Sequence, residues 1–588
     1  MKPLGIGSEE HLRLLAVARG ERPPDLLVRG GTLANVYSGE LLPANVAVSD
    51  GHVAYVGPRE PEPGPETEVV EARGLYVAPG YVEAHNHPWA MYNPVTLAAK
   101  VLPLGATTIV ADTLFFHLQM GPDGLEAMLD DLRDGPLNYL WVTRLISQSR
   151  FSGEREVFST QTARRLLDRD DVAGTAEVTR WTELAAGDAH VLAGIAAARE
   201  RGKVSDGHTG GASENRLPAL VAAGIDADHE AITKEELLTR LRLGLWTMLR
   251  HSSLRPDVPE LARAITEDGV CDARLILTTD GASPDHLAEN GFMDHALRVA
   301  VECGVPPMTA LRMATVNPAT WLGLDRYLGG LAPGRRADLV LLPDLARFVP
   351  ELVVSGGRTV ARSGELLADL PTLDWDRYGA RTEFSPDLPL KDPKLYVPQL
   401  PGRETRVGMS FRSAAITAAK RFHLPPDGSL SDLPGVLHAA LVDRGGRWIS
   451  RCPVEGFATD LDGFASTYNT TTHLLVLGRD PRSMSVAAAR VRDKRGGVAL
   501  AEAGRVVFDF GLDLAGMMSE APFDAIAHAN ARLAAELGKR GYPFHDVLYT
   551  LLFFTNDFLP AVKLTPRGLL DVKTGRIITP AETLPEPA

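Results

Sequence analysis

The sequence of 588 residues has few cysteines and no long hydrophobic run. Its cysteines are Cys271, Cys303 and Cys452, an odd and scattered set that describes neither a disulfide framework nor a cysteine-rich zinc site, so a reducing compartment fits best. No segment reaches the roughly 20 apolar residues needed to span a bilayer. The N-terminal stretch also lacks the continuous apolar core of a signal peptide. We therefore expect a cytoplasmic protein with no membrane association.

A basic surface is missing as well. The chain has 61 Lys and Arg against 75 Asp and Glu, a formal net charge of −14 at pH 7, whereas proteins that bind nucleic acids usually carry a basic face. The composition, 45% hydrophobic and 23% charged, is typical of ordinary globular proteins. These features argue against nucleic acid as a partner and favour a small-molecule substrate.

The chain is too long for one hydrophobic core. In its first part, the pattern of apolar and turn residues changes at two places. Short β-prone runs broken by turn residues predict one β-sandwich built from two flanking segments, residues 1–78 and 325–370. Between them, over residues 79–324, apolar β-prone runs alternate with helical stretches. This pattern is typical of a (β/α)8 barrel, and buried parallel strands explain the continuous apolar character of the runs.

The remainder of the chain has a different composition. Residues 371–400 are rich in Pro and Asp and are predicted to form a linker. Residues 401–588 contain a new mixture of strands and helices and are predicted to form an additional α+β C-terminal domain. The expected fold class is therefore α/β, a (β/α)8 barrel accompanied by a β-sandwich and this third domain.

Two histidines end the β-prone run GYVEAHNHPW. His85 and His87 are two residues apart, and side chains at this spacing on a strand share a face. Both imidazoles can therefore point to one metal ion in the mouth of the barrel. Two unrelated polar residues in a loop remain the alternative interpretation of this string by itself.

Further residues of the ligand type end later β-prone runs. Glu177 closes VAGTAEV, His208 lies in VSDGHTGG and His229 in GIDADHE. A carboxylate at the end of a buried strand gains a strong partner from a divalent cation, although a helix-capping glutamate and hydrogen-bonded histidines are common alternatives. Asp280 ends RLILTTD, where it can accept a proton from a metal-bound water or serve as a turn residue before Gly281. The set follows barrel order, which favours a metal centre.

This order of an HxH pair, a strand-end Glu, two single His and a final Asp resembles the amidohydrolase superfamily. The chain is most similar to its bacterial adenine deaminase family, in the strings GLYVAPGYVEAHNH, GTAEV, SDGHTGG, GIDADHEAITKEELLTRLRLG, LTTDGASPDHL, ALRMATVNPATWLGL, GFATDLDGFAS, LDLAGMMSEAP and LPAVKLTPRGLLDV. The resemblance runs through most of the chain. It implies a metal-dependent hydrolase of purine metabolism that converts adenine and water to hypoxanthine and ammonia, by attack of a hydroxide that bridges two metals.

The resemblance also implies roles for individual residues. His85 and His87 would bind one divalent metal ion, His208 and His229 the other, and Glu177 would bridge the two. Asp280 would bind the first metal and shuttle protons. Family precedent favours manganese or iron, with zinc as the alternative. Homologous enzymes often form dimers, which makes a homodimer a candidate assembly.

Two further residues are candidates for contact with the substrate. Glu230, adjacent to His229, is a candidate catalytic or substrate-facing acid, and its alternative role is a helix-starting carboxylate. Trp89 could stack on a heterocyclic substrate, although buried aromatic side chains mostly belong to cores.

The sequence departs from the family where the substrate is expected. Pro88, Trp89 and Ala90 replace the family's Ile-Glu-Ser, and Gly281 and Ala282 replace an Asp-Arg pair. The family's Pro-His-Glu string after Asp112 and its C-terminal His-Asp-Ser-His string, here residues 469–472, are also replaced. An enzyme with the same metals that hydrolyses another aminated heterocycle, an amide or a cyclic amide is therefore the first alternative. A catalytically silent binding or scaffold protein is the second.

Overall fold

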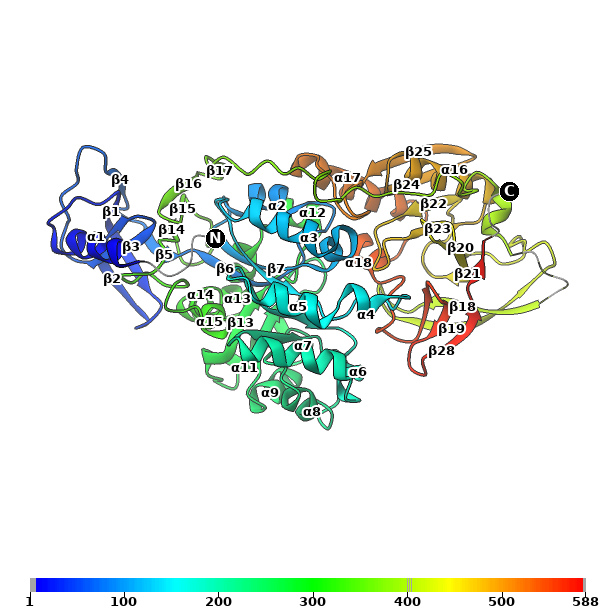
Figure 1. Ribbon diagram of the computed structural model, residues 1–588, viewed down its shortest axis with the longest axis horizontal. Coiled ribbons are helices and arrows are strands. Elements are labelled where there is room, and N and C mark those ends of the chain that lie inside the picture. Colours follow the sequence, from blue (N-terminus) through cyan, green and yellow to red (C-terminus); the bar gives the residue numbers. More distant parts are fainter. Residues whose placement is uncertain (1–6, 399, 401, 403, 585–588) are drawn as a thin grey trace.

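The computed structural model describes residues 7–398, 400, 402 and 404–584 (Figure 1). A nine-stranded sheet lies at one end of the molecule, an eight-stranded parallel sheet surrounded by helices occupies the middle, and the C-terminal part of the chain forms the other end. This arrangement confirms the predicted fold class. Among the described residues, no helix is both long and apolar enough to cross a membrane.

The first sheet joins two segments that are far apart in the sequence. Its strand order is β17-β16-β15-β14-β5-β1-β2-β3, with β4 paired to β1. The two segments meet where β5 pairs antiparallel with β14, so that Val77 lies opposite Leu341 and Pro79 opposite Leu339. The strands are β1 (Leu26–Asn35), β2 (Glu40–Ser49), β3 (His52–Gly57), β4 (Glu68–Glu71), β5 (Tyr76–Pro79), β14 (Leu339–Leu342), β15 (Leu352–Ser355), β16 (Arg358–Arg362) and β17 (Glu365–Leu366), and helix α1 spans Ser8–Arg19.

The second sheet is the barrel, in the order β13-β12-β11-β10-β9-β8-β7-β6, so that each strand pairs with its neighbour in sequence. Its strands are β6 (Tyr81–Asn86), β7 (Ala106–Asp112), β8 (Asn138–Thr143), β9 (Val172–Val178), β10 (Val204–Gly207), β11 (Ala227–Asp228), β12 (Trp246–Arg250) and β13 (Leu275–Thr278). Val82, Val110, Leu140 and Ile276 are buried together in one hydrophobic cluster. Burial on both faces explains why these strands read as continuous apolar runs.

The buried carboxylate of Glu83 links the first and last barrel strands. The Thr278 hydroxyl donates to its Oε1 at 2.5 Å, and the Thr279 backbone N–H donates to its Oε2 at 2.8 Å. Helices surround the barrel: α2 (Pro94–Val101), α3 (Leu114–Leu132), α4 (Glu154–Val157), α5 (Thr160–Leu167), α6 (Trp181–Ala185), α7 (Ala189–Glu200), α8 (Leu217–Ala222), α9 (Lys234–Arg242), α10 (Val258–Leu261), α11 (Arg263–Thr266), α12 (Pro284–Asn290), α13 (Met293–Glu302), α14 (Pro307–Met313) and α15 (Val316–Trp321).

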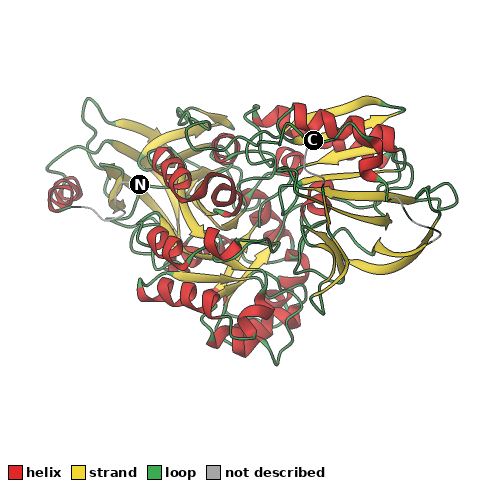
Figure 2. Ribbon diagram, turned by 45° about the vertical axis from the view of Figure 1, so that its right-hand side comes forward, coloured by secondary structure: helices red, strands yellow, loops and turns green. Residues whose placement is uncertain are grey.

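The C-terminal part of the chain has a nine-stranded sheet of order β19-β18-β21-β20-β23-β22-β24-β25, with β29 on β21, and a three-stranded sheet β26-β27-β28 (Figure 2). The elements are β18 (Glu404–Phe411), β19 (Thr417–Leu424), β20 (Val436–Val442), β21 (Trp448–Glu455), β22 (Gly463–Ser466), β23 (Leu474–Gly478), α16 (Pro481–Asp493), β24 (Gly497–Glu502), β25 (Arg505–Gly511), α17 (Phe523–Gly538), α18 (Val547–Leu552), β26 (Val562–Thr565), β27 (Gly568–Asp571), β28 (Arg576–Pro580) and β29 (Glu582–Thr583).

This C-terminal part packs against the barrel through polar contacts as well as apolar ones. The Asn530 side chain in α17 donates to Asp285 Oδ1 at 2.7 Å, and the Asn93 side chain donates to the carbonyl of Ser519 at 2.8 Å. The segment predicted as a linker runs beside the barrel, where Trp375 is buried. The third unit is therefore held firmly against the barrel and can contribute to its open end.

Candidate metal centre

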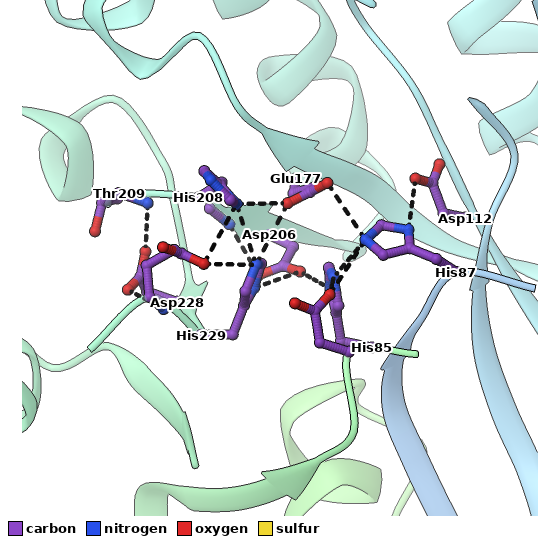
Figure 3. A network of polar contacts seen from close by, with 12 residues as sticks. His85, His87, Asp112, Glu177, Asp206, His208, Thr209, Asp228 and His229 are labelled. Carbon is purple, nitrogen blue, oxygen red and sulfur yellow. Dashed lines mark hydrogen bonds and ion pairs between the residues drawn. The ribbon is translucent and has the colours of Figure 1, made fainter. Parts of the chain in front are cut away.

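The six residues singled out by their order in the sequence lie together at the carboxyl ends of the barrel strands. Figure 3 shows five of them: His85, His87, Glu177, His208 and His229. His85 and Glu177 belong to β6 and β9, and Asp280 lies just beyond β13. All six residues are buried, with between 0% and 9% of the surface of each residue exposed. In a barrel with parallel strands, this end of the strands is where catalytic residues gather.

His85, His87 and Asp280 form the first group of converging ligand atoms. The Nε2 atoms of the two histidines are 3.3 Å apart, and they lie 3.1 and 3.2 Å from Asp280 Oδ1. Donors bound to one tetrahedral ion at about 2.1 Å lie about 3.4 Å from one another. Asp280 Oδ1 is buried and accepts no hydrogen bond within the part of the chain that the structure describes. The three atoms therefore fit a shared divalent cation.

His208 and His229 form the second group with Glu177. Their closest ring nitrogens are 3.3 Å apart, and Glu177 Oε2 lies 2.8 Å from His208 Nδ1 and 3.3 Å from His229 Nε2. The other oxygen of the same carboxylate, Oε1, is 3.5 Å from His87 Nε2 in the first group. Glu177 thus stands between the groups with one oxygen toward each, which is the geometry expected of a bridging ligand.

The buried carboxylate of Glu177 is kept ionised by Arg144. Burial is the largest influence on its pKa and would raise it, but Arg144 and His208 outweigh burial and hold the pKa well below its ordinary value. Arg144 Nη2 donates to Glu177 Oε1 at 2.7 Å, and the same guanidinium pairs with Asp112. The centre therefore presents a carboxylate anion at neutral pH, the form that binds cations.

Two aspartates lie beside the Nδ1 atoms of His85 and His87, on the side of each ring opposite to Nε2. Asp206 Oδ2 lies 2.6 Å from His85 Nδ1, and Asp112 Oδ2 lies 3.1 Å from His87 Nδ1. Carboxylates in this position fix the ring so that its other nitrogen faces the metal. Sequence reasoning missed both roles, although Asp206 is part of the same VSDGH string that supplied His208. An acid two residues before a candidate ligand was the available signal.

The main chain and Arg250 together fix the orientation of Asp280. Its φ is 57°, in the left-handed region that side chains other than glycine seldom adopt, and such strain concentrates at functional sites. Arg250, at the end of β12, donates to Asp280 Oδ2 at 2.5 Å. The opposite oxygen, Oδ1, is thereby left facing the two histidines of the first group. Arg250 was not identified from the sequence.

Glu230 and Trp89 both line the cavity in front of these ligands. Arg250 and Arg255 lie 2.8 and 3.2 Å from the Glu230 carboxylate. Burial opposes ionisation most strongly, yet Arg250 and the other neighbouring positive groups lower the pKa of Glu230 to about 2. The indole of Trp89 packs on the ring of His87, with ring centres 4.6 Å apart.

The departures noted in the sequence also fall at or beside this cavity. Ala282 lines an adjoining apolar cavity together with Trp89 and Ala90. Thr470, from the replaced C-terminal string, shares a hydrogen bond of 2.9 Å with Ser149 in a barrel loop. Ala90 and Ala282 therefore lie beside the candidate ligands, and Thr470 contacts a barrel loop.

An eight-stranded parallel barrel with two groups of histidines and carboxylates at its open end is the architecture of a metal-dependent hydrolase. The Amidohydrolase family model matches residues 76–360, and the model of the Adenine deaminase C-terminal domain matches residues 415–576. The family implies a divalent metal centre, and the clustered residues are those that could hold it.

Full-length relatives extend this similarity over the whole chain. The adenine deaminase of Rubrobacter xylanophilus is 36% identical over 582 residues, and that of Paracoccus denitrificans is 33% identical over 577 residues. These alignments cover 95% of both chains in the first case and 96% of both in the second. The Bacillus subtilis protein YerA, itself only provisionally assigned as an adenine deaminase, is 33% identical, with 95% of each chain covered. The chain belongs to the adenine deaminase family.

Proposed function

We propose that the protein hydrolyses adenine to hypoxanthine and ammonia, with His85, His87 and Asp280 as ligands of one divalent cation and His208 and His229 as ligands of a second, bridged by Glu177. The observation that carries the proposal is the placement of Glu177, which directs one carboxylate oxygen toward each group of histidines. Named relatives across the full chain supply the choice of adenine.

The chain's own residues would divide the chemistry as follows. When bound, the cations lower the pKa of water so that hydroxide is available at neutral pH. Asp280, whose free Oδ1 faces the first ligand group, is the proposed proton acceptor and passes the proton to the departing amine. Glu230, held ionised by Arg250 and Arg255, is proposed to accept a hydrogen bond from the substrate.

The identity of the metal and the setting of the enzyme belong to the same proposal. We favour manganese or iron, with zinc as the alternative, because hard and borderline divalent ions share these nitrogen and oxygen ligands. The small-molecule substrate would be a purine base, which places the enzyme in purine metabolism. The scattered cysteines favour the cytoplasm, and a homodimer is the candidate assembly.

Turnover of adenine by enzyme loaded with Mn²⁺ or Fe²⁺ tests this function. We expect equal amounts of hypoxanthine and ammonia, and loss of both products after chelation. A parallel panel of aminated heterocycles, amides and cyclic amides addresses the second candidate, which is favoured by the replaced residues at Ala90 and Ala282. If adenine is not hydrolysed but a panel compound is, the proposal of a metal-dependent hydrolase stands and its substrate is the panel compound.

Metal analysis of a His208→Ala variant tests the ligand assignment independently of any substrate. The metal content after dialysis should fall from about two to about one ion per chain, because only one of the two ligand groups loses a donor. His423→Ala is the control, since His423 lies on β19 and its ring contacts Thr405. Full metal content in His208→Ala would contradict the assignment.

A further inference from the structure

A second, largely apolar cavity opens beside the metal centre. It shares His87, Trp89 and Asp280 with the cavity that faces the candidate ligands. Its walls come from both the barrel and the C-terminal part of the chain: Trp89, Leu254, Ala282, Tyr468, Leu548 and Leu552. Small-molecule sites are mostly lined by apolar and aromatic side chains, and their few polar groups decide the orientation of the ligand.

Asp546 is the acidic group that the C-terminal part of the chain contributes to this wall. It precedes α18 as the N-cap residue, and its Oδ1 accepts the backbone N–H of Tyr549 at 2.9 Å. The side chain is only 5% exposed, yet Oδ2 has no hydrogen-bond partner within the described residues. Buried acceptors are normally paired, because an unpaired one loses its solvation without compensation.

No hydrogen bond reaches Asp546 Oδ2 among the described residues, although the nearby Ser253 hydroxyl does influence the carboxylate. No ion pair is formed on its carboxylate among the residues that the structure describes. Burial, the largest influence, raises its pKa, and the backbone hydrogen bond from Tyr549 together with the Ser253 side chain offsets this effect only in part. The free oxygen therefore suits a ligand that brings its own N–H group, and a carboxylate there disfavours anionic ligands.

We propose that Asp546 is a specificity-determining residue, whose Oδ2 accepts a hydrogen bond from a ring N–H of a flat, uncharged or cationic nitrogen heterocycle. The inference rests on the proposed function and deepens it. The ring lies against Trp89 and the leucines of α18, and its opposite edge faces His87 and Asp280, which line both cavities. The C-terminal part of the chain thus selects the substrate that the barrel hydrolyses.

Two ligands that differ at one atom test this proposal on the metal-loaded protein. Benzimidazole has a ring N–H, and benzoxazole replaces that N–H with oxygen in a ring of almost the same shape. Neither carries an amino group that can be hydrolysed. By calorimetry, we expect the wild type to bind benzimidazole about tenfold or more tightly than benzoxazole, the range expected for a hydrogen bond to a buried carboxylate.

The Asp546→Asn variant should lose this preference. The Tyr549 N–H keeps the amide oxygen in the Oδ1 position, so the amide NH₂ takes the place of Oδ2 and an acceptor becomes a donor. Asparagine caps helices as well as aspartate does. Asp480→Asn is the matched control, since Asp480 is the N-cap of α16 and does not line either cavity. That variant should keep the wild-type preference.

The outcomes separate this proposal from the proposed function. If the wild type binds the two ligands equally or binds neither, or if Asp546→Asn keeps the preference, the assignment of Asp546 is overturned. An Asp546→Ser variant, which keeps a capping oxygen but is too short to fill the Oδ2 position, should also lose the preference. A wild type that shows the preference but releases no ammonia from adenine overturns the deaminase proposal alone.

Discussion

Replacing Asp280 with asparagine is expected to lower kcat about 100- to 10,000-fold while the bound metal stays near the wild-type amount. The amide retains an oxygen that can coordinate a cation, but it cannot accept and return a proton at neutral pH. The measurement is the rate of ammonia release at saturating substrate, with the metal content of the same sample determined after dialysis.

A buried aspartate outside the centre provides the control for this variant. Asp294 is 2% exposed and accepts the Phe292 backbone N–H at 2.7 Å, a hydrogen bond that asparagine can also accept. Asp294→Asn should retain its kcat. Unchanged turnover in Asp280→Asn with intact metal content would reject the proton-transfer role and leave Asp280 as a ligand only.

The Arg144→Met variant is expected to lose about 3–5 kcal/mol of stability, because it leaves two buried carboxylates without their cation. Arg144 is fully buried and pairs with both Asp112 and Glu177. The effect should appear in the urea-induced unfolding of metal-free protein. Added divalent cations should recover part of it, since a cation at the centre replaces some of the lost positive charge beside Glu177.

The comparison variant for this measurement is Arg263→Met. Arg263 pairs with Glu260 and Glu267 on the outer surface of the barrel, where solvent screens the interaction. Its unfolding curve should almost overlay that of the wild type. Equal curves for Arg144→Met and the wild type would show that Arg144 is not needed to compensate the buried acids.

The structure brings together the candidate ligands that the sequence predicted, whereas the residues that contact them from outside the cluster were not predicted. His85, His87 and Glu177 could be recognised because strand ends are marked by apolar runs and a parallel barrel gathers all such ends at one face. The position of each candidate ligand along the chain therefore sufficed to place it at that face. The division into a barrel and a β unit made from two segments could be predicted for the same reason, because a change in the pattern of apolar and turn residues is a local feature of the sequence.

The supporting residues depend on which elements are neighbours in space. Arg144 follows β8 and reaches both Asp112 and Glu177 only because β8 lies between β7 and β9. Arg250 shows no ligand motif, and its contact with Asp280 follows from the pairing of β12 with β13. Asp546 comes from the opposite end of the chain, and no periodicity in the sequence connects it with the barrel.

The pairing of β5 with β14 joins the chain segments that lead into and out of the barrel. The chain enters the barrel directly after Pro79 and returns from it at Leu339, and these two residues face each other across the pair. The Gly80 N–H also donates to the carbonyl of Asp338 at 3.0 Å. These hydrogen bonds join the two ends of the barrel segment outside the barrel itself. We therefore expect them to restrain fraying of the chain next to β6, the strand that carries His85.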